Sequence, residues 1–178
     1  MADYGALNGE GTLVFERLLP GPIERVWDYI VKPELREAWF CGGKTDDHAG
    51  GTMTLAFDHR KLSESGPPEK YADQETGSFD CDILVYEPPH RLDITWPAEQ
   101  GHPPTEVSIM LSEADGKVRL VLQHKRLTDG DFLIGAAAGW HAHFDLLQDN
   151  LDGRAVRDFW PRHMALEAAY ETRLKKTG

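Results

Sequence analysis

The clearest pattern in the chain is a strict alternation of apolar and polar residues over five successive stretches. In the second stretch, Phe79, Cys81, Ile83 and Val85 alternate with polar residues such as Asp80. Side chains two residues apart share one face of a strand, so this pattern predicts an antiparallel sheet with one covered face and one solvent-exposed face. The predicted strands span residues 51–57, 76–86, 91–96, 105–112 and 117–125.

Three shorter elements are predicted before these strands. Residues 12–19 read as a first strand, which Pro-Gly-Pro ends. Residues 23–31 carry apolar side chains at helical spacing, and Pro33 breaks this helix and starts a short second one over residues 33–40. The order of strand, two helices, five strands and a long helix predicts an α+β fold, with helices on the covered side of one antiparallel sheet.

A long helix is predicted over residues 132–151, because its apolar residues recur every three to four positions. Its middle is a run of small residues, Gly135 to Gly139, followed by the bulky Trp140. Small side chains leave room either for close backbone approach or for empty volume against the sheet. The apolar stripe comprises Phe132, Ala136, Trp140, Phe144, Leu147 and Leu151, with His143 beside it.

The chain as a whole divides into three parts, and a polar segment interrupts the second part. Residues 1–11 are expected to be a loose N-terminal leader, and residues 12–153 form the main domain. Residues 154–178 are predicted to be a helical extension packed on the same domain, with Met164, Ala168 and Leu174 on its apolar stripe. The polar residues 58–75 interrupt the strands and are either a functional lid or a disordered insertion.

Composition narrows the classes of partner. The formal net charge of −11 disfavours nucleic acid and anionic membranes, which bind clustered Lys and Arg. No apolar run is long enough to span a membrane, and no export signal is present at the N-terminus, so we expect a cytoplasmic protein. The 2 cysteines are too few for a disulfide framework.

The predicted inner surface is rich in aromatic residues with a few polar points. Apolar walls with scattered polar groups are typical of a small-molecule pocket, although the same residues equally describe an ordinary packed core. If a ligand binds there, the candidate ligand-binding residues are Phe57, Phe79, Ile83, Ile94, Trp96, Ile109, Leu122, His124, Trp140, His143 and Phe144.

Motifs for catalysis or metal binding are missing. His141 and His143 lie two positions apart on a helix, so they cannot bind one metal from one face, and we expect no metal and no cofactor. Four further histidines, including His59, fall in predicted loops and are expected to be solvated, and His163 is expected at the surface. No Gly-x-Ser-x-Gly motif, phosphate-binding glycine loop or partnered Cys–His pair is present; Cys41 is the better-placed thiol of the two.

The chain resembles the START-like, helix-grip (SRPBCC) superfamily, and within it bacterial proteins similar to the C-terminal domain of the activator of Hsp90 ATPase. The resemblance covers residues 12–174 and is carried by RLLPGPIERVWDYIVKPELREAWF, GGTMTLAF, EPPHRLDITW and GWHAHFDLLQDNL. It implies a six- or seven-stranded curved antiparallel sheet that grips the long C-terminal helix, with a cavity between them.

Three hypotheses for function follow. The first is a binding protein for a hydrophobic or aromatic small molecule, which we favour over an enzyme. The second is an aromatase/cyclase-type enzyme that uses the same cavity, and the third is a chaperone-linked stress or interaction protein, as the Hsp90 name of the family implies. A homodimer is compatible with all three.

Overall fold

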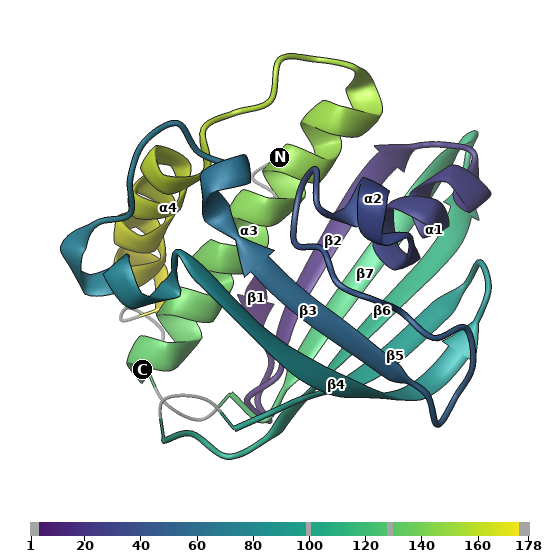
Figure 1. The fold of residues 1–178 in the computed structure, drawn as a ribbon, viewed down its shortest axis with the longest axis horizontal. Helices are drawn as coiled ribbons and strands as arrows, with labels where there is room; N and C mark the ends of the chain where they lie inside the picture. The colour runs from purple at the N-terminus through teal and green to yellow at the C-terminus, as the bar shows by residue number, and fades with distance from the viewer. Residues whose placement is uncertain (1–3, 99–100, 128–129, 175–178) are drawn as a thin grey trace.

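A seven-stranded antiparallel sheet forms the framework of the computed structural model, which describes residues 4–98, 101–127 and 130–174. The strand order is β1-β2-β7-β6-β5-β4-β3, so the first two strands continue the edge formed by β7 (Figure 1). This confirms the predicted α+β class and places the sheet at seven strands. The strands are β1 (Ala6–Leu7), β2 (Leu13–Pro20), β3 (Thr52–Asp58), β4 (Thr76–Glu87), β5 (Arg91–Trp96), β6 (Thr105–Ala114) and β7 (Lys117–Lys125).

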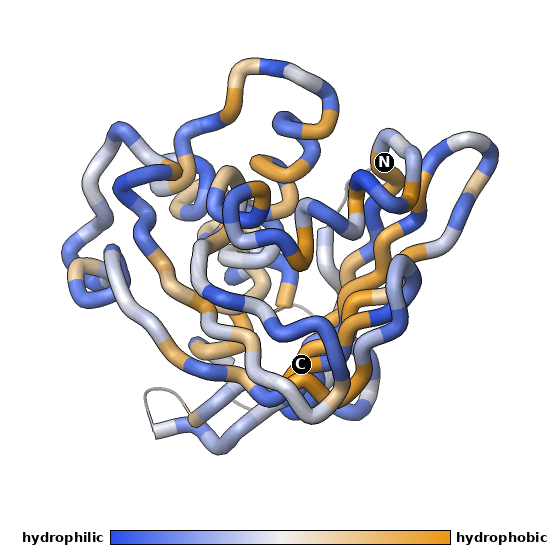
Figure 2. The backbone as a smooth tube through the Cα atoms, turned by 45° about the vertical axis from the view of Figure 1, so that its right-hand side comes forward, coloured by the Kyte–Doolittle hydropathy of each residue, from blue (hydrophilic) through white to orange (hydrophobic). Residues whose placement is uncertain are grey.

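The curved sheet wraps around α3 (Gly130–Asp152), as Figure 1 shows. Hydrophobic stretches are concentrated along the strands, and the connecting loops are mostly hydrophilic (Figure 2). The alternation in the sequence explains this arrangement, since residues such as Cys81 and Ile83 are buried whereas Asp80 and Asp82 are exposed. The covered face of the sheet and α3 therefore enclose the interior of the protein.

Two short helices follow β2 and cover one end of this interior. α1 (Ile23–Val31) buries its apolar stripe, as its helical spacing predicted. α2 (Pro33–Arg36) is shorter than the predicted 33–40. The guanidinium of Arg36 donates hydrogen bonds to the carbonyls of Cys41, Gly42 and Gly43, which holds the chain in a turn instead of a further helical stretch.

The other end of the interior is covered by α4 (Phe159–Leu174) and by the segment between β3 and β4. α4 packs against α3, and the segment contains two short 3-10 helices, η1 (His59–Lys61) and η2 (Glu69–Gln74). In Figure 1 this segment and α4 lie side by side, on the opposite side of α3 from α1 and α2. α4 also reaches the C-terminal half of α3, where Arg162 donates to Asp145.

The face that α4 buries differs from the prediction. Met164 and Ala168, which were expected on the apolar stripe, are exposed, and Leu174 is half-buried. The buried residues begin with two aromatic side chains immediately before Pro161 and continue at helical spacing; they are Phe159, Trp160, His163, Leu166, Glu167 and Tyr170. The stripe was misplaced because His163 and Glu167 are polar residues that are nevertheless buried.

Two further differences are local. A β-bulge between Ile83 and Val85 pairs Val85 with Asp93 and Tyr86 with Leu92, so Val85 leaves the covered face on which strict alternation placed it. Part of the segment expected to be a loose leader forms β1, and the amide of Gly5 donates to the hydroxyl of Tyr170. Residues 1–3 of the leader and 175–178 of the extension lie outside the described residues.

Candidate functional site

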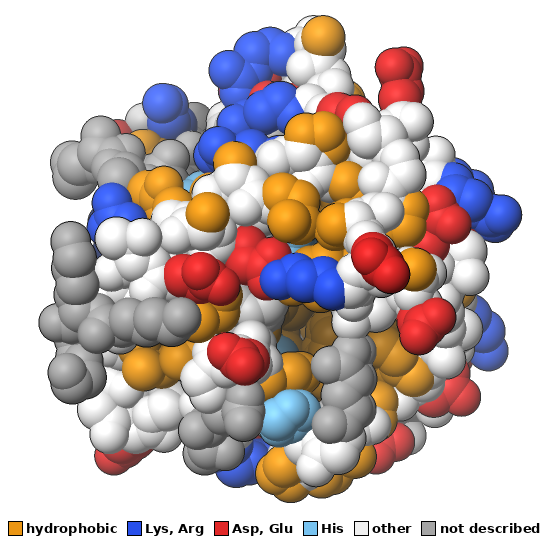
Figure 3. All heavy atoms as spheres, turned by 90° about the vertical axis from the view of Figure 1, so that its left-hand side faces the viewer, with side chains coloured by type: hydrophobic (Ala, Val, Ile, Leu, Met, Phe, Trp, Pro, Cys, Tyr) orange, Lys and Arg blue, Asp and Glu red, His pale blue; other side chains and the backbone are white. Residues whose placement is uncertain are grey.

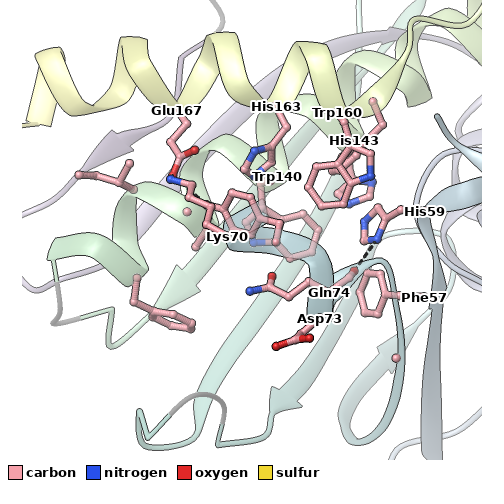
Figure 4. A pocket seen from close by; sticks show the side chains of 18 of the residues that line it. Phe57, His59, Lys70, Asp73, Gln74, Trp140, His143, Trp160, His163 and Glu167 are labelled. Carbon is pink, nitrogen blue, oxygen red and sulfur yellow. Dashed lines mark hydrogen bonds and ion pairs between the residues drawn. The ribbon is translucent and has the colours of Figure 1, made fainter. Parts of the chain in front are cut away.

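A cavity of about 870 Å³ lies between the sheet and the N-terminal half of α3, with α4 and the segment 58–75 over it. Figure 3 shows the opening as a hollow with apolar side chains inside it, and Figure 4 shows side chains from α3, α4 and η2 converging on the cavity. Its size falls within the range of about 300–1,000 Å³ that is usual for small-molecule sites. Aromatic side chains are the largest group in the lining: Phe40, Phe57, Tyr71, Phe79, Trp96, Phe132, Trp140, Phe159 and Trp160.

The structure brings together six of the eleven candidate ligand-binding residues. Those that line the cavity are Phe57, Phe79, Trp96, His124, Trp140 and His143. The other five do not line it and are buried in the packed core; they are Ile83, Ile94, Ile109, Leu122 and Phe144. All eleven face the interior, but only one end of that interior is hollow.

The small residues of α3 contribute empty volume, one of the two alternatives that the sequence left open. Gly135, Ala136 and Gly139 line the cavity. A Cβ atom added at Gly139 would meet no heavy atom within 4 Å. Ala137 and Ala138, between them in sequence, are fully buried and do not line the cavity. The glycines therefore hollow out one face of the helix while the alanines pack closely on another.

Trp140 and His124 form a hydrogen-bonded chain on one wall. Trp140 Nε1 donates to His124 Nδ1 at 3.1 Å, and His124 Nε2 lies 2.7 Å from the hydroxyl oxygen of Thr105. Burial lowers the pKa of His124 to about 4, so the imidazole is neutral at pH 7 and carries its proton on Nε2. Both polar groups are thus satisfied within the wall, and what remains toward the cavity is aromatic surface.

His143 and His59 present hydrogen-bond acceptors. His143 Nδ1 donates to the carbonyl of Trp39 at 2.8 Å, and His59 Nδ1 donates to the carbonyl of Gln74 at 3.0 Å. Burial is the main cause of a lowered pKa in both, so both rings are neutral at pH 7 and their Nε2 atoms are acceptors. Their ring centroids lie 5.5 Å apart. The two rings therefore place two hydrogen-bond acceptors close together among the aromatic side chains.

The predictions for His59 and His163 were wrong. His59 is buried because the chain folds back after β3 and stacks its ring on Phe159, with centroids 4.6 Å apart. His163, on α4, is only 4% exposed and lines the cavity. Burial lowers the pKa of His163 to about 4. The i, i+4 spacing of Phe159, His163 and Glu167 was the signal in the sequence that could have placed His163 on the buried face.

Two buried nitrogens have no hydrogen-bond partner within the described part of the chain. They are Nδ1 of His163 and Nε1 of Trp160, and both are enclosed by neighbouring atoms. Unsatisfied buried polar groups are uncommon in proteins because each costs free energy. Both residues line the cavity, but these two nitrogens have almost no surface accessible from it.

The segment 58–75 is described throughout and is attached to α4. Asp158, just before α4, accepts hydrogen bonds from the hydroxyls of Ser63 and Ser65. On α4, Glu167 accepts from Lys70 Nζ and, at 2.8 Å, from the hydroxyl of Tyr71. These contacts hold the segment over the cavity, which is the position that a lid would take.

Cysteine and metal chemistry receive no support from the geometry. Burial raises the pKa of both Cys41 and Cys81 to about 12, so neither is a thiolate at pH 7. In residues 4–98, 101–127 and 130–174, no group of three or more His, Cys, Asp or Glu side chains is arranged to hold a metal ion. None of the helices in the same ranges combines the length and hydropathy that a membrane span needs.

A comparison of the chain with models of protein families shows to which family it belongs. The model of the family "Activator of Hsp90 ATPase homolog 1-like protein" matches residues 20–152. The chain belongs to this family. The match ends at the last residue of α3, so α4 lies outside it. No curated protein matches the chain significantly.

Solved structures agree with this assignment. A protein of Bordetella parapertussis is 38% identical, with 97% of this chain and 93% of that one covered and a TM-score of 0.79. CalU16 from Micromonospora echinospora is 23% identical, with coverage of 95% and 93% and a TM-score of 0.66. DynU16, from the dynemicin biosynthetic locus, is 20% identical, with coverage of 84% and 50% and a TM-score of 0.64. The latter two show a shared helix-grip fold.

Proposed function

We propose that this protein binds a hydrophobic or aromatic small molecule in the cavity between the sheet and α3. The observation that carries the proposal is the cavity of about 870 Å³, in whose lining aromatic side chains are the largest group. Aromatic surface that faces empty volume gains free energy when an apolar guest covers it, at about 25 cal/mol per Å². Gly135 and Gly139 support the proposal, because larger residues there would improve the helix and fill the space.

The second hypothesis, an aromatase/cyclase-type enzyme that uses acid–base catalysis in the same cavity, has less support. It needs a histidine paired with a carboxylate, whereas His143 and His59 donate to backbone carbonyls. His124 bonds to Trp140 and Thr105. These histidines are oriented by neutral groups, which fits recognition of a ligand better than proton transfer.

The chaperone-linked hypothesis needs a contiguous apolar surface for docking. Within the part of the chain that the structure describes, the exposed large hydrophobic residues come from five different segments: Leu7, Leu18, Leu84, Val156 and Met164. The geometry therefore favours the proposal that the protein binds a small molecule in its cavity. The occurrence of the same fold in a protein of a biosynthetic locus, DynU16, is compatible with it.

A titration with Nile red, a neutral apolar fluorophore, tests the proposal. We expect saturable binding to the wild type and at least a tenfold loss in Gly139→Leu, whose side chain would occupy the cavity. Gln148→Leu is the matched control, since it adds the same side chain to α3 at a half-exposed position that does not line the cavity. Native mass spectrometry of the freshly purified protein would show a co-purified ligand. Absence of saturable binding, or an equal loss in both variants, would overturn the proposal.

A further inference from the structure

The chemistry of the polar groups around the cavity indicates what kind of head group the ligand carries. Among the described lining residues, four are acidic, and Lys70 is the one Lys or Arg. The acids are Asp73, Asp131, Glu167 and Glu171. Lys70 pairs with Glu167, so the lining carries a formal charge of −4 + 1 = −3 when the histidines are neutral. Figure 3 shows several acidic side chains near the hollow.

The arrangement on α4 is regular. His163, Glu167 and Glu171 are spaced i, i+4 and i+8, which places them in one row along the helix, and all three line the cavity. Figure 4 shows His163 and Glu167 extending from α4 toward the cavity. Asp73, on η2, also lines it, and neither Asp73 nor Glu171 forms an ion pair with any other described residue. Their charges are therefore available to a ligand at the opening.

The groups deeper in the cavity are also acceptors. The Nε2 atoms of His143 and His59 are lone-pair acceptors, because each Nδ1 already donates to a backbone carbonyl. Three donors in the lining are engaged, since Trp140 donates to His124, and Lys70 and Tyr71 donate to Glu167. Nε1 of Trp160 has no partner among the described residues, but neighbouring atoms enclose it. A ligand that brought its own N–H donors would match these acceptors, whereas a carboxylate would meet acceptors and negative charge.

The aromatic lining favours the same head group. A cation close to the face of Trp, Tyr or Phe is attracted by the negative charge of the ring face. Trp140, Trp160 and Tyr71 line the cavity together with the acidic residues. From the acidic row on α4, the inward acceptors and the aromatic walls together, we infer that the ligand is an aromatic molecule that carries a basic amino group. This inference rests on the proposed function and assigns Asp73 and Glu171 as residues that determine specificity.

Three fluorescent probes with one ring system test the inference: 1-pyrenemethylamine, 1-pyrenemethanol and 1-pyrenecarboxylate, titrated at pH 7. We expect the amine to bind at least tenfold more tightly than the carboxylate, with the alcohol between them. The ratio of the two dissociation constants should shrink at least threefold in the double variant Asp73→Asn/Glu171→Gln, and also in 1 M salt, which screens exposed charges. Asp82→Asn, an exposed acid on the outer face of β4, is the control and should leave the ratio unchanged.

The outcomes separate the two proposals. Saturable binding of the alcohol without preference for the amine over the carboxylate would overturn the inference and leave the proposed function in place. A preference that the double variant does not reduce would overturn the role of Asp73 and Glu171. If none of the three probes binds saturably, both the inference and the proposed function fail.

Discussion

The two halves of α3 line two different interiors. Along the closed half, residues 144–152, Phe144 stacks on Trp39 and packs edge-on against Phe15, and no residue of this half lines the cavity. Along the cavity half, residues 130–143, Gly135 and Gly139 line the cavity, and Gly139 faces open space. The same apolar stripe runs through both halves, so the periodicity of the helix does not distinguish them.

The difference lies in how each half is covered. At the closed half, the covering residues bond directly to the helix: Arg25 donates to the carbonyl of Leu151, Ala38 accepts from Asn150, and Arg162 donates to Asp145. At the cavity half, α4 and the segment 58–75 are linked to each other through Asp158 and Glu167. A covering layer that is supported by its own contacts can span a space without filling it. The comparison suggests that stability resides mainly in the closed half and binding in the cavity half.

The largest expected effect is in the closed half. Phe144→Ala removes a fully buried ring and should lower the free energy of unfolding by about 3–5 kcal/mol, because the surrounding core cannot collapse to fill the void. Urea unfolding monitored by circular dichroism measures it. A loss below about 1 kcal/mol would show that this half is not the tightly packed one.

The pH dependence of stability should be set partly by the cavity half. The pKa of His163 is lowered to about 4, below the ordinary value of 6.5, so the unfolded state takes up the proton first as the pH falls. The stabilisation that comes from this group is complete above pH 6.5 and is lost as the pH falls toward 4. His163→Gln should flatten the dependence of the unfolding free energy on pH by about 1 kcal/mol per pH unit between these limits. Unfolding curves for both proteins at several pH values would check this, and identical slopes would contradict it.

A ring that borders the cavity should matter less for stability than one in the closed half. Phe79 is half-buried and contacts Phe57 and Trp96, with ring centroids 5.8 Å and 5.1 Å away. Phe79→Ala should lower the free energy of unfolding by about 1 kcal/mol, because less apolar surface returns to water than for a fully buried ring. Both variants should be measured under the same conditions. An equal loss of unfolding free energy in Phe79→Ala and Phe144→Ala would contradict the proposed difference between the two halves.

The smallest expected effect has the opposite sign. Gly139→Ala places a methyl group in open space and replaces the poorer helix former, so stability should rise by about 0.5–1 kcal/mol. Thermal unfolding should show a higher midpoint. A lower midpoint would mean that the backbone at this position is approached more closely than the cavity allows.

Prediction from the sequence succeeded where a residue's surroundings follow from its immediate neighbours. Alternation placed five strands, and the spacing from Phe132 to Leu151 placed α3. It did not locate the site fully, because Ile83, Ile94, Ile109, Leu122 and Phe144 share the inward pattern of the cavity residues yet lie in the packed core. His59 was missed because a polar residue in a loop carries no local sign of burial. His163 was missed because the spacing that places it on the face of Phe159 joins it to another polar residue, Glu167.

The sequence by itself determined strands β2 to β7 and the inward faces of α1 and α3, because these depend on side-chain periodicities of 2 and 3.6 residues. Only the tertiary structure decided which end of the interior is filled and which is hollow. That outcome depends on contacts between distant segments: Arg25 donates to the carbonyl of Leu151 on α3 at one end, whereas at the other end Lys70 pairs with Glu167 on α4 above the cavity. No local pattern specifies such distances, and the position of the cavity follows from them.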